Sequence, residues 1–201
     1  MILAVAIAIG ALLTWMLQRP TALLAVRIGA VSRIRSDRWS HPAPLQRLAG
    51  LAFSIPAIAC CIWVSYNALA LSLAFLVLLG MIDDAKELKP AVKFLGQIVA
   101  VLPYTLLSGS FSMQPVLLFW LLLHINAANM FDNMDGSLAL VAAICLIGSG
   151  AMLYAYSPSA VFAFALAGGL LCFLRINWHP AKAFMGDTGS MVVGMVLGIL
   201  S

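Results

Sequence analysis

Five aspartates stand in three clusters along the chain, and their side chains could do metal chemistry. The clusters are Asp83 with Asp84, Asp132 with Asp135, and Asp187 alone. Few sulfur or imidazole ligands lie near them in the sequence. Carboxylate oxygens are the ligands that hard cations prefer in proteins. The clusters therefore favour a site for Mg²⁺ or Mn²⁺.

Asparagines accompany the second cluster. Asn126, Asn129, Asp132 and Asp135 recur at every third residue. Neighbours at this spacing share a helix face, although the row drifts by about 60° per step. The amides could hold a phosphate, a sugar or a uracil edge while the acids hold a metal ion. A calcium-binding loop is excluded here, because its twelfth position would be Ala143 instead of glutamate.

The third cluster lies in a glycine-containing segment, Gly186 to Ser190, which precedes an apolar stretch. Glycines let the backbone approach a ligand closely, and the free N–H groups of a helix N-terminus attract anions. An ordinary helix cap, provided by Asp187 or Ser190, is the structural alternative. Beside the other clusters, the segment points to phosphate chemistry.

Three more polar side chains near the clusters could contact a phosphate group: Lys93, His41 and His179. Each has a structural alternative. A lysine at a helix end can extend its ammonium to the membrane interface, and a loop histidine can simply be hydrated.

The amino-acid composition indicates an integral membrane protein. Of the 201 residues, 64% are hydrophobic and 9% are charged, whereas an average soluble domain has about 25% charged residues. Such a chain could not cover its surface in water, so a soluble enzyme and a disordered chain are both excluded. The net charge of +4 is better explained by membrane orientation than by nucleic acid, and we expect no nucleic-acid partner.

Recurring apolar runs predict an all-α, polytopic bundle in the lipid bilayer. We expect about seven complete transmembrane helices and the start of an eighth, in one membrane-embedded domain of residues 1–201. Residues 21–31 are mildly amphipathic and are expected to lie along the interface. The expected helices are 1–17, 48–65, 67–82, 93–108, 116–131, 137–156 and 158–175, with the eighth starting at residue 190.

The charges orient this bundle. All 11 basic and 7 acidic residues fall in or beside the breaks after the first, third, fifth and seventh helices. The positive-inside rule places these breaks in the cytoplasm and the N-terminus outside. All five aspartates then meet at one membrane depth, where carboxylates are expected to be paired, metal-bound or hydrated. A solvated helix end could explain one aspartate, but three clusters at one level favour a shared site.

The polar segments resemble those of the polyprenyl-phosphate N-acetylhexosamine-1-phosphate transferase family, which initiates peptidoglycan, O-antigen and teichoic acid synthesis in bacteria. The likeness follows family order over residues 35–200. A weaker likeness lies between Arg38 and Gly50. The segments that carry the resemblance are Gly80–Asp84, Lys93–Gln97, Asn126–Gly136 and Asn177–Ser190.

The resemblance implies a reaction and its residues. A sugar 1-phosphate would pass from a UDP-N-acetylhexosamine to undecaprenyl phosphate, with release of UMP, at the cytoplasmic face of a bacterial inner membrane. Mg²⁺, or Mn²⁺, would be held by Asp187, Asp84 and Asp135. The implied catalytic residues are Asp83, Asp84, Asp132, Asp135 and Asp187. The implied substrate-binding residues are Lys93, Asn126, Asn129, Asn177, His179, Gly186, Ser190, His41 and Arg47. The protein could also form a homodimer.

Asp83 and Asp84 would orient or deprotonate the lipid phosphate. The second pKa of a phosphomonoester is near 6, so this phosphate is already largely dianionic at pH 7. A general base is then dispensable. We therefore favour a positioning or metal-binding role for Asp83.

Two departures from the family pattern matter. Asn133 and Met134 stand in a motif that more often has glycine after its first aspartate. Family members also continue into a later loop with a histidine motif for the nucleotide sugar. We therefore expect a C-terminally truncated form that binds Mg²⁺ or Mn²⁺ weakly and turns over little UDP-sugar until a complete eighth helix and the following loops are restored.

Other functions stay open at this stage. An inactive fragment or scaffold of the family would keep the fold without the reaction. An intramembrane prenyltransferase would use acid-bound Mg²⁺ on a diphosphate, but nothing in that chemistry requires the segment from Pro180 to Ser190. A cation transporter is disfavoured, because transport sites lie near the middle of the bilayer.

Overall fold

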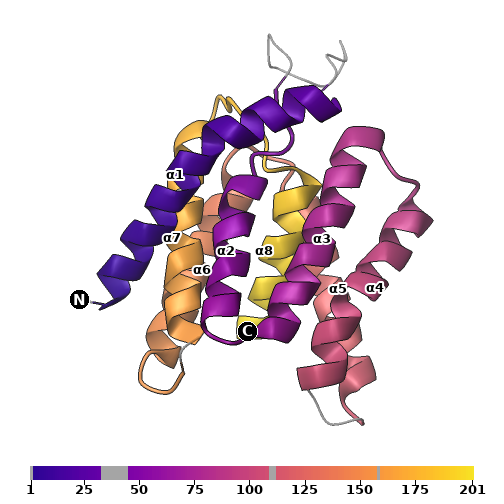
Figure 1. The fold of residues 1–201 in the computed structure, drawn as a ribbon. Coiled ribbons are helices and arrows are strands. Elements are labelled where there is room, and N and C mark those ends of the chain that lie inside the picture. The colour runs from indigo at the N-terminus through magenta and orange to yellow at the C-terminus, as the bar shows by residue number, and fades with distance from the viewer. Residues whose placement is uncertain (1, 33–44, 109–111, 158) are drawn as a thin grey trace.

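The computed structural model describes residues 2–32, 45–108, 112–157 and 159–201. These residues form eight α-helices and no β-strand, and Figure 1 shows the helices packed as one bundle. The predicted all-α, polytopic bundle is confirmed. The helices are α1 (Ile2–Ile28), α2 (Leu51–Trp63), α3 (Asn67–Lys86), α4 (Pro90–Ser108), α5 (Gln114–Phe131), α6 (Ser137–Leu153), α7 (Ser159–Asn177) and α8 (Gly186–Leu200).

Five of the described helices are long and apolar enough to cross a membrane: α1, α3, α4, α5 and α7. The others, α2, α6 and α8, have 13, 17 and 15 residues. At about 1.5 Å per residue they rise about 20–26 Å, against a hydrocarbon core of about 30 Å. The seven expected helices are present as α1 to α7, followed by α8, although α2 and α6 are shorter than expected. The chain is a multi-pass membrane protein.

The first helix does not end where the sequence suggested. The polar pair Gln18-Arg19 favoured an end near residue 17, yet α1 continues through Pro20 to Ile28. Pro20 removes one backbone donor from the helix, and the Thr21 hydroxyl donates to the Gln18 carbonyl at 3.1 Å. The expected separate interfacial segment is thus mostly the last part of α1, which runs diagonally across the bundle in Figure 1.

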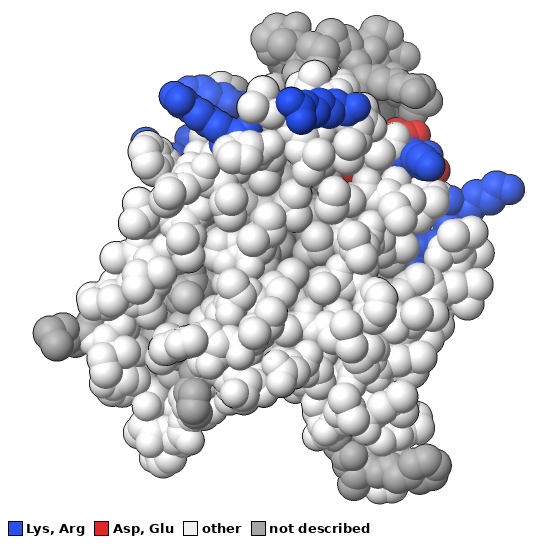
Figure 2. Space-filling model, viewed as in Figure 1, with Lys and Arg blue, Asp and Glu red and all other residues white. Residues whose placement is uncertain are grey.

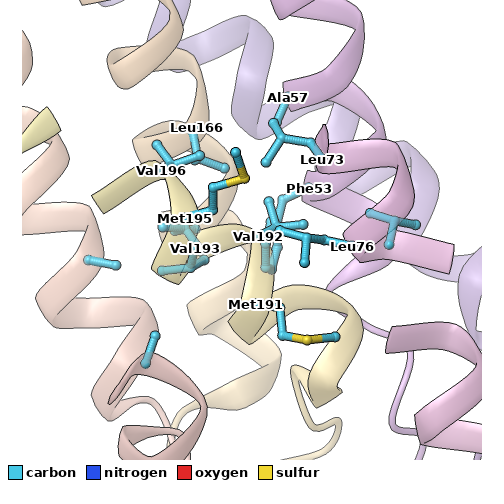
Figure 3. Close-up of a cluster of buried hydrophobic side chains, with 14 of the residues drawn as sticks. Phe53, Ala57, Leu73, Leu76, Leu166, Met191, Val192, Val193, Met195 and Val196 are labelled. Carbon is cyan, nitrogen blue, oxygen red and sulfur yellow. The ribbon is translucent and has the colours of Figure 1, made fainter. Parts of the chain in front are cut away.

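The core is built around α8. Figure 3 shows its side chains pointing toward α2, α3 and α7. Close approach to α5 depends on glycine, since a Cβ on Gly194 would lie 2.6 Å from the His124 carbonyl oxygen. This packing fixes the position of the α8 N-terminus. The labelled core residues are Phe53 and Ala57 of α2, Leu73 and Leu76 of α3, Leu166 of α7, and Met191, Val192, Val193, Met195 and Val196 of α8.

Charged side chains gather at one end of the bundle. On the face seen in Figure 2, lysine, arginine and acidic side chains lie toward the upper end, and the other described residues on this face are uncharged. The C-terminal ends of α3, α5 and α7 and the N-terminal ends of α4 and α8 lie at this same end. The bundle therefore brings the three aspartate clusters to one level.

Candidate active site

A short strap, residues 45–50, crosses the loop that leads into α8. The Phe184 N–H donates to the Gln46 carbonyl at 2.9 Å, and the Gly50 N–H donates to the Met185 carbonyl at 3.0 Å. A Cβ on Gly50 would lie 2.4 Å from the Cα of Gly189, so only glycine permits this approach. The strap therefore fixes the position of the loop whose last residues begin the helix.

Gly186 shows why the loop needs glycine at its end. Its φ is +71°, and a Cβ there would lie 1.7 Å from the Arg47 carbonyl oxygen and 2.6 Å from Asp84 Oδ2. Both conditions exclude a side chain. The sequence suggested that Gly186 lets the backbone approach a ligand, whereas in the structure the Cα of Gly186 lies against the strap.

Replacing Gly186 by alanine is expected to destabilise the protein. Left-handed backbone costs an alanine about 1–2 kcal/mol, and the contact with the Arg47 carbonyl adds to that. A loss of about 2 kcal/mol or more corresponds to roughly 4–8 °C in unfolding temperature for a chain of this size, measured in detergent. Gly148→Ala is the matched control, because nothing lies within 4 Å of a Cβ at Gly148 in α6. Equal losses for both variants would refute this role of Gly186.

Asp84 caps the N-terminus of α8 from a different helix. It accepts hydrogen bonds from the Asp187 N–H at 3.0 Å, from the Thr188 N–H at 3.0 Å and from the Thr188 hydroxyl at 2.7 Å. Arg47 Nε lies 3.8 Å from Asp84 Oδ1, the oxygen that accepts the Asp187 N–H. The first N–H groups of a helix lack partners within the helix, so this buried carboxylate satisfies them. The structural alternative was a cap by Asp187 or Ser190, but in the structure Asp84 of α3 provides the cap.

Lys93 joins two of the predicted aspartates. Its Nζ lies 2.7 Å from Asp187 Oδ2 and 3.0 Å from Asp83 Oδ2, and it donates to the Asn129 side-chain oxygen at 3.4 Å. The Asn129 amide donates to Asp187 Oδ1 and, at 2.9 Å, to the Ser190 hydroxyl. The first turns of α4 and α8 and the ends of α3 and α5 thus meet in one ionic cluster.

Asn126 lies one turn before Asn129 in α5 and is held by Gln97, which was not among the predicted site residues. Its amide donates to the Gln97 side-chain oxygen at 2.9 Å and to the Leu122 carbonyl at 2.8 Å. Gln97 is fully buried, and its own amide lies 3.5 Å from the sulfur of Met191. A glutamine one turn after Lys93 in an apolar run was the signal that could have identified it.

Asp135, His179 and Asn177 form a second group. Asp135 Oδ2 accepts the Ala181 N–H at 3.0 Å and lies 3.0 Å from His179 Nδ1. The buried Asn177 accepts the Gly136 N–H at 3.1 Å and donates to the Ala183 carbonyl at 3.0 Å. Asn177 therefore ties the loop before α6 to the loop after α7. Its amide contacts backbone in this arrangement, where a substrate contact was expected.

Asp132 caps the end of α5 near these groups. Burial, followed by the negative charges of Asp187, Asp84 and Asp135, raises the pKa of the Asp132 carboxyl to about 8. Its ordinary value is close to 4. The side chain is therefore largely protonated at neutral pH in the metal-free protein.

The raised pKa predicts a specific dependence of stability on pH. A carboxyl with a higher pKa in the folded protein than in the unfolded chain destabilises the fold as pH rises from about 4 to about 8. With EDTA present, the unfolding temperature of Asp132→Asn should exceed that of the unmodified protein by a margin that grows by a few degrees between pH 5 and 8 and then levels off. A constant margin would contradict the raised pKa.

A cavity of about 360 Å³ opens beside the ionic cluster. Two cationic groups and two amides line it, so it offers donors to an anion, while Asp83 offers oxygens to a cation. Phosphate groups bound next to a divalent ion need this combination. The lining residues are Arg47, Asp83, Glu87, Leu88, Pro90, Lys93, Phe94, Asn126 and Asn129.

The carboxylate oxygens suit a hard cation as ligands, but they do not form a complete metal-binding site by themselves. Among the described residues, no three acidic, histidine or cysteine side chains stand as a group that could hold a metal ion. Asp187 and Asp83 converge on the Lys93 ammonium, and such all-oxygen donors suit Mg²⁺, which keeps several of its waters. Asp84 and Asp135, the other expected ligands, both accept backbone N–H groups.

The structure therefore brings together most of the predicted site. Asp83, Asp84, Asp187, Lys93, Asn126, Asn129, Arg47, Gly186 and Ser190 belong to the cluster, the cap or the cavity lining. Asp135, His179 and Asn177 hold the neighbouring loops. His41 lies outside the described residues.

The chain matches a known protein family over most of its length. Residues 66–201 match the family described as Glycosyl transferase family 4. This segment contains α3 to α8 and all five predicted aspartates. The resemblance inferred from the motifs is thereby confirmed.

Curated relatives are also similar to the chain, and two of them match it over more than the residues of the family match. The chain is 32% identical to the decaprenyl-phosphate N-acetylglucosaminephosphotransferase of Mycobacterium tuberculosis, over 96% of the chain and 58% of that protein. It is 31% identical to the probable undecaprenyl-phosphate N-acetylglucosaminyl 1-phosphate transferase of Bacillus subtilis, over 89% of the chain and 56% of that protein. It is 32% identical to the phospho-N-acetylmuramoyl-pentapeptide-transferase of Listeria monocytogenes, over 69% of the chain and 51% of that protein. The chain thus spans little more than half the length of these relatives.

Proposed function

Because the chain belongs to glycosyl transferase family 4, we propose that it transfers N-acetylhexosamine 1-phosphate from a UDP-sugar to undecaprenyl phosphate, with release of UMP. The observation that supports this best is the pairing of Asp83, Lys93 and Asp187 beside a cavity that Arg47 also lines. Phosphoryl transfer requires positioning and charge neutralisation more than covalent chemistry by the protein. Acids for a cation and cations for phosphate, side by side, meet that requirement.

In this proposal, the cationic residues bind phosphate and the acidic residues bind the metal ion. Arg47 and Lys93 bind phosphate oxygens in the cavity, and the Asn126 and Asn129 amides orient the substrate beside them. Asp187 and Asp83 would hold Mg²⁺, which when bound would supply positive charge to offset that of the diphosphate. Asp84 does not contact substrate in this arrangement; through its bonds to the N–H groups of Asp187 and Thr188, it sets where Asp187 points. Asp83 need not take a proton from the lipid phosphate, because that phosphate is largely dianionic at pH 7, and we assign Asp83 to holding the metal ion.

We place this site at the cytoplasmic face of a bacterial inner membrane, with the N-terminus outside. The charged end supports this orientation through the positive-inside rule, and a site at the interface lets the polyprenyl tail stay in lipid. A membrane-impermeant thiol reagent added to intact cells, with the four native cysteines replaced, should label Ser112→Cys between α4 and α5. It should not label Lys182→Cys before α8. The reverse pattern would overturn the orientation.

The reaction is tested by product formation. Membranes containing the protein are supplied with UDP-N-acetylglucosamine, undecaprenyl phosphate and Mg²⁺, in a host whose own transferase is depleted. The chain is assayed alone and joined to the segments that follow the matched region in the Bacillus subtilis relative. The joined form should give a lipid-linked sugar that disappears with EDTA or without the lipid. Failure of the joined form, with both proteins folded, would favour a scaffold role instead.

A further inference from the structure

Lys93 occupies an unusual position between two carboxylates. Its Nζ lies 2.7 Å from one oxygen of Asp187 and 3.0 Å from one oxygen of Asp83. The Lys93 side chain is 18% exposed, and those of Asp187 and Asp83 are 12% and 8% exposed. Two carboxylates this close, with little water around them, repel each other unless a cation lies between them. In this structure the ammonium is that cation.

A divalent ion and the ammonium would compete for one space. Mg²⁺ and Mn²⁺ approach carboxylate oxygens to about 2.1 Å, closer than the ammonium does here. An ion bound by both oxygens would therefore lie where the Lys93 Nζ lies, and two cations in contact would repel strongly. Asn129 offers its side-chain oxygen to the same point, so one set of oxygens serves either cation.

A cavity beside the cluster could accommodate the Lys93 ammonium if it left the two carboxylates. The side chain lines the cavity of about 360 Å³ beside the cluster, together with Arg47, Asn126 and Asn129. Lysine is a point charge on a flexible stem of four carbons, so its ammonium can turn from the carboxylates into this cavity without movement of α4. It would then add a positive charge to the wall where Arg47 lies.

Building on the proposed metal-dependent function, we propose that Lys93 is an exchangeable counterion. Its ammonium holds Asp83 and Asp187 together in the metal-free protein and leaves them when a divalent cation binds. Metal binding and the position of Lys93 are then linked in both directions, as thermodynamic coupling requires. Anything that removes the ammonium should strengthen metal binding, and metal binding should free the ammonium.

The first arm of the test measures Mn²⁺ binding by the loss of the free-ion signal in electron paramagnetic resonance. Lys93→Met keeps the length of the side chain and removes its charge. This variant should bind Mn²⁺ about tenfold or more tightly than the unmodified chain. Lys182→Met is the matched control, because Lys182 is an exposed lysine in the loop before α8, and it should change the affinity less than twofold. Equal or weaker binding by Lys93→Met would overturn the exchange.

The second arm needs no substitution. The unmodified protein is treated briefly with an amine-acylating reagent, with and without saturating Mn²⁺, and labelling of each lysine is read by mass spectrometry. Mn²⁺ should increase labelling of Lys93 severalfold and leave Lys182 unchanged. Unchanged or reduced labelling of Lys93 at saturating Mn²⁺ would refute the exchange and leave the metal site standing. Absence of Mn²⁺ binding by the unmodified protein would contradict both the exchange and the metal-dependent function.

Discussion

Asp187→Asn is expected to weaken Mn²⁺ binding by about a hundredfold and to leave the fold intact. The substitution keeps the volume of the side chain and removes one charge. A unit charge a few ångströms from a cation contributes several kcal/mol at an effective dielectric constant of about 20, and about 2.7 kcal/mol corresponds to a hundredfold. The fold should survive, because the backbone N–H of residue 187 still binds Asp84.

Two measurements on the same sample test this separation. Mn²⁺ affinity is read by electron paramagnetic resonance, and the unfolding temperature is read with EDTA present. Asp187→Asn should stay within a few degrees of the unmodified protein in unfolding temperature. Near-normal Mn²⁺ affinity in Asp187→Asn would show that Asp187 is not a principal ligand.

The opposite pattern is expected for Asp84→Ala. This change removes the acceptor of three hydrogen bonds at the start of α8. Each buried donor left without a partner costs about 1–3 kcal/mol, so a loss of about 3 kcal/mol is expected, equivalent to roughly 6–12 °C for a chain of this size. Circular dichroism on heating in detergent measures it.

Glu87→Gln is the matched control for Asp84→Ala. Glu87 lies just after α3, also pairs with Arg47, at 3.6 Å, and has a side chain that is 74% exposed. Exposed ion pairs contribute about 0–1 kcal/mol, so the unfolding temperature should barely change. If Asp84→Ala were as stable as Glu87→Gln, the cap between α3 and α8 would not support the loop.

The features of the structure that depend on composition and on the positions of charges could be predicted from the sequence. Apolar runs predicted a bundle of helices in a membrane, and the positions of the charges predicted that Asp83, Asp132 and Asp187 would meet at one level. Spacing along the chain determines such features directly. The motifs together, of which the segment from Asn177 to Ser190 is the most specific, predicted the family, and the match over residues 66–201 confirms it.

The division of roles among the acids could not be predicted in this way. Adjacent aspartates in a helix point about 100° apart, and only the packing of α8 decides which of the two meets its N-terminus. Asp84 does so, and Asp83 faces Lys93 instead. The strap likewise depends on backbone contacts between residues far apart in sequence, such as Gly50 with Met185, and no side-chain pattern encodes these.

The helix ends followed tertiary contacts for the same reason. The expected second helix included residues 48–50, but these residues form part of the strap, and α2 begins at Leu51. The expected eighth helix began at residue 190, but the cap from Asp84 lets α8 begin at Gly186. The apolar sequence suggested a helix at the first place and the glycine-containing sequence suggested a loop at the second, and packing decided where both helices begin.

One measurement tests the proposed transfer most directly. UDP-N-acetylglucosamine carrying a ³²P label in its β-phosphate is given, with undecaprenyl phosphate and Mg²⁺, to the chain joined to the following segments of the Bacillus subtilis relative. Transfer of sugar 1-phosphate predicts that the label enters the lipid fraction in step with release of unlabelled UMP, and that Asp187→Asn abolishes both. Release of labelled UDP, with no label in the lipid, would contradict the proposed transfer.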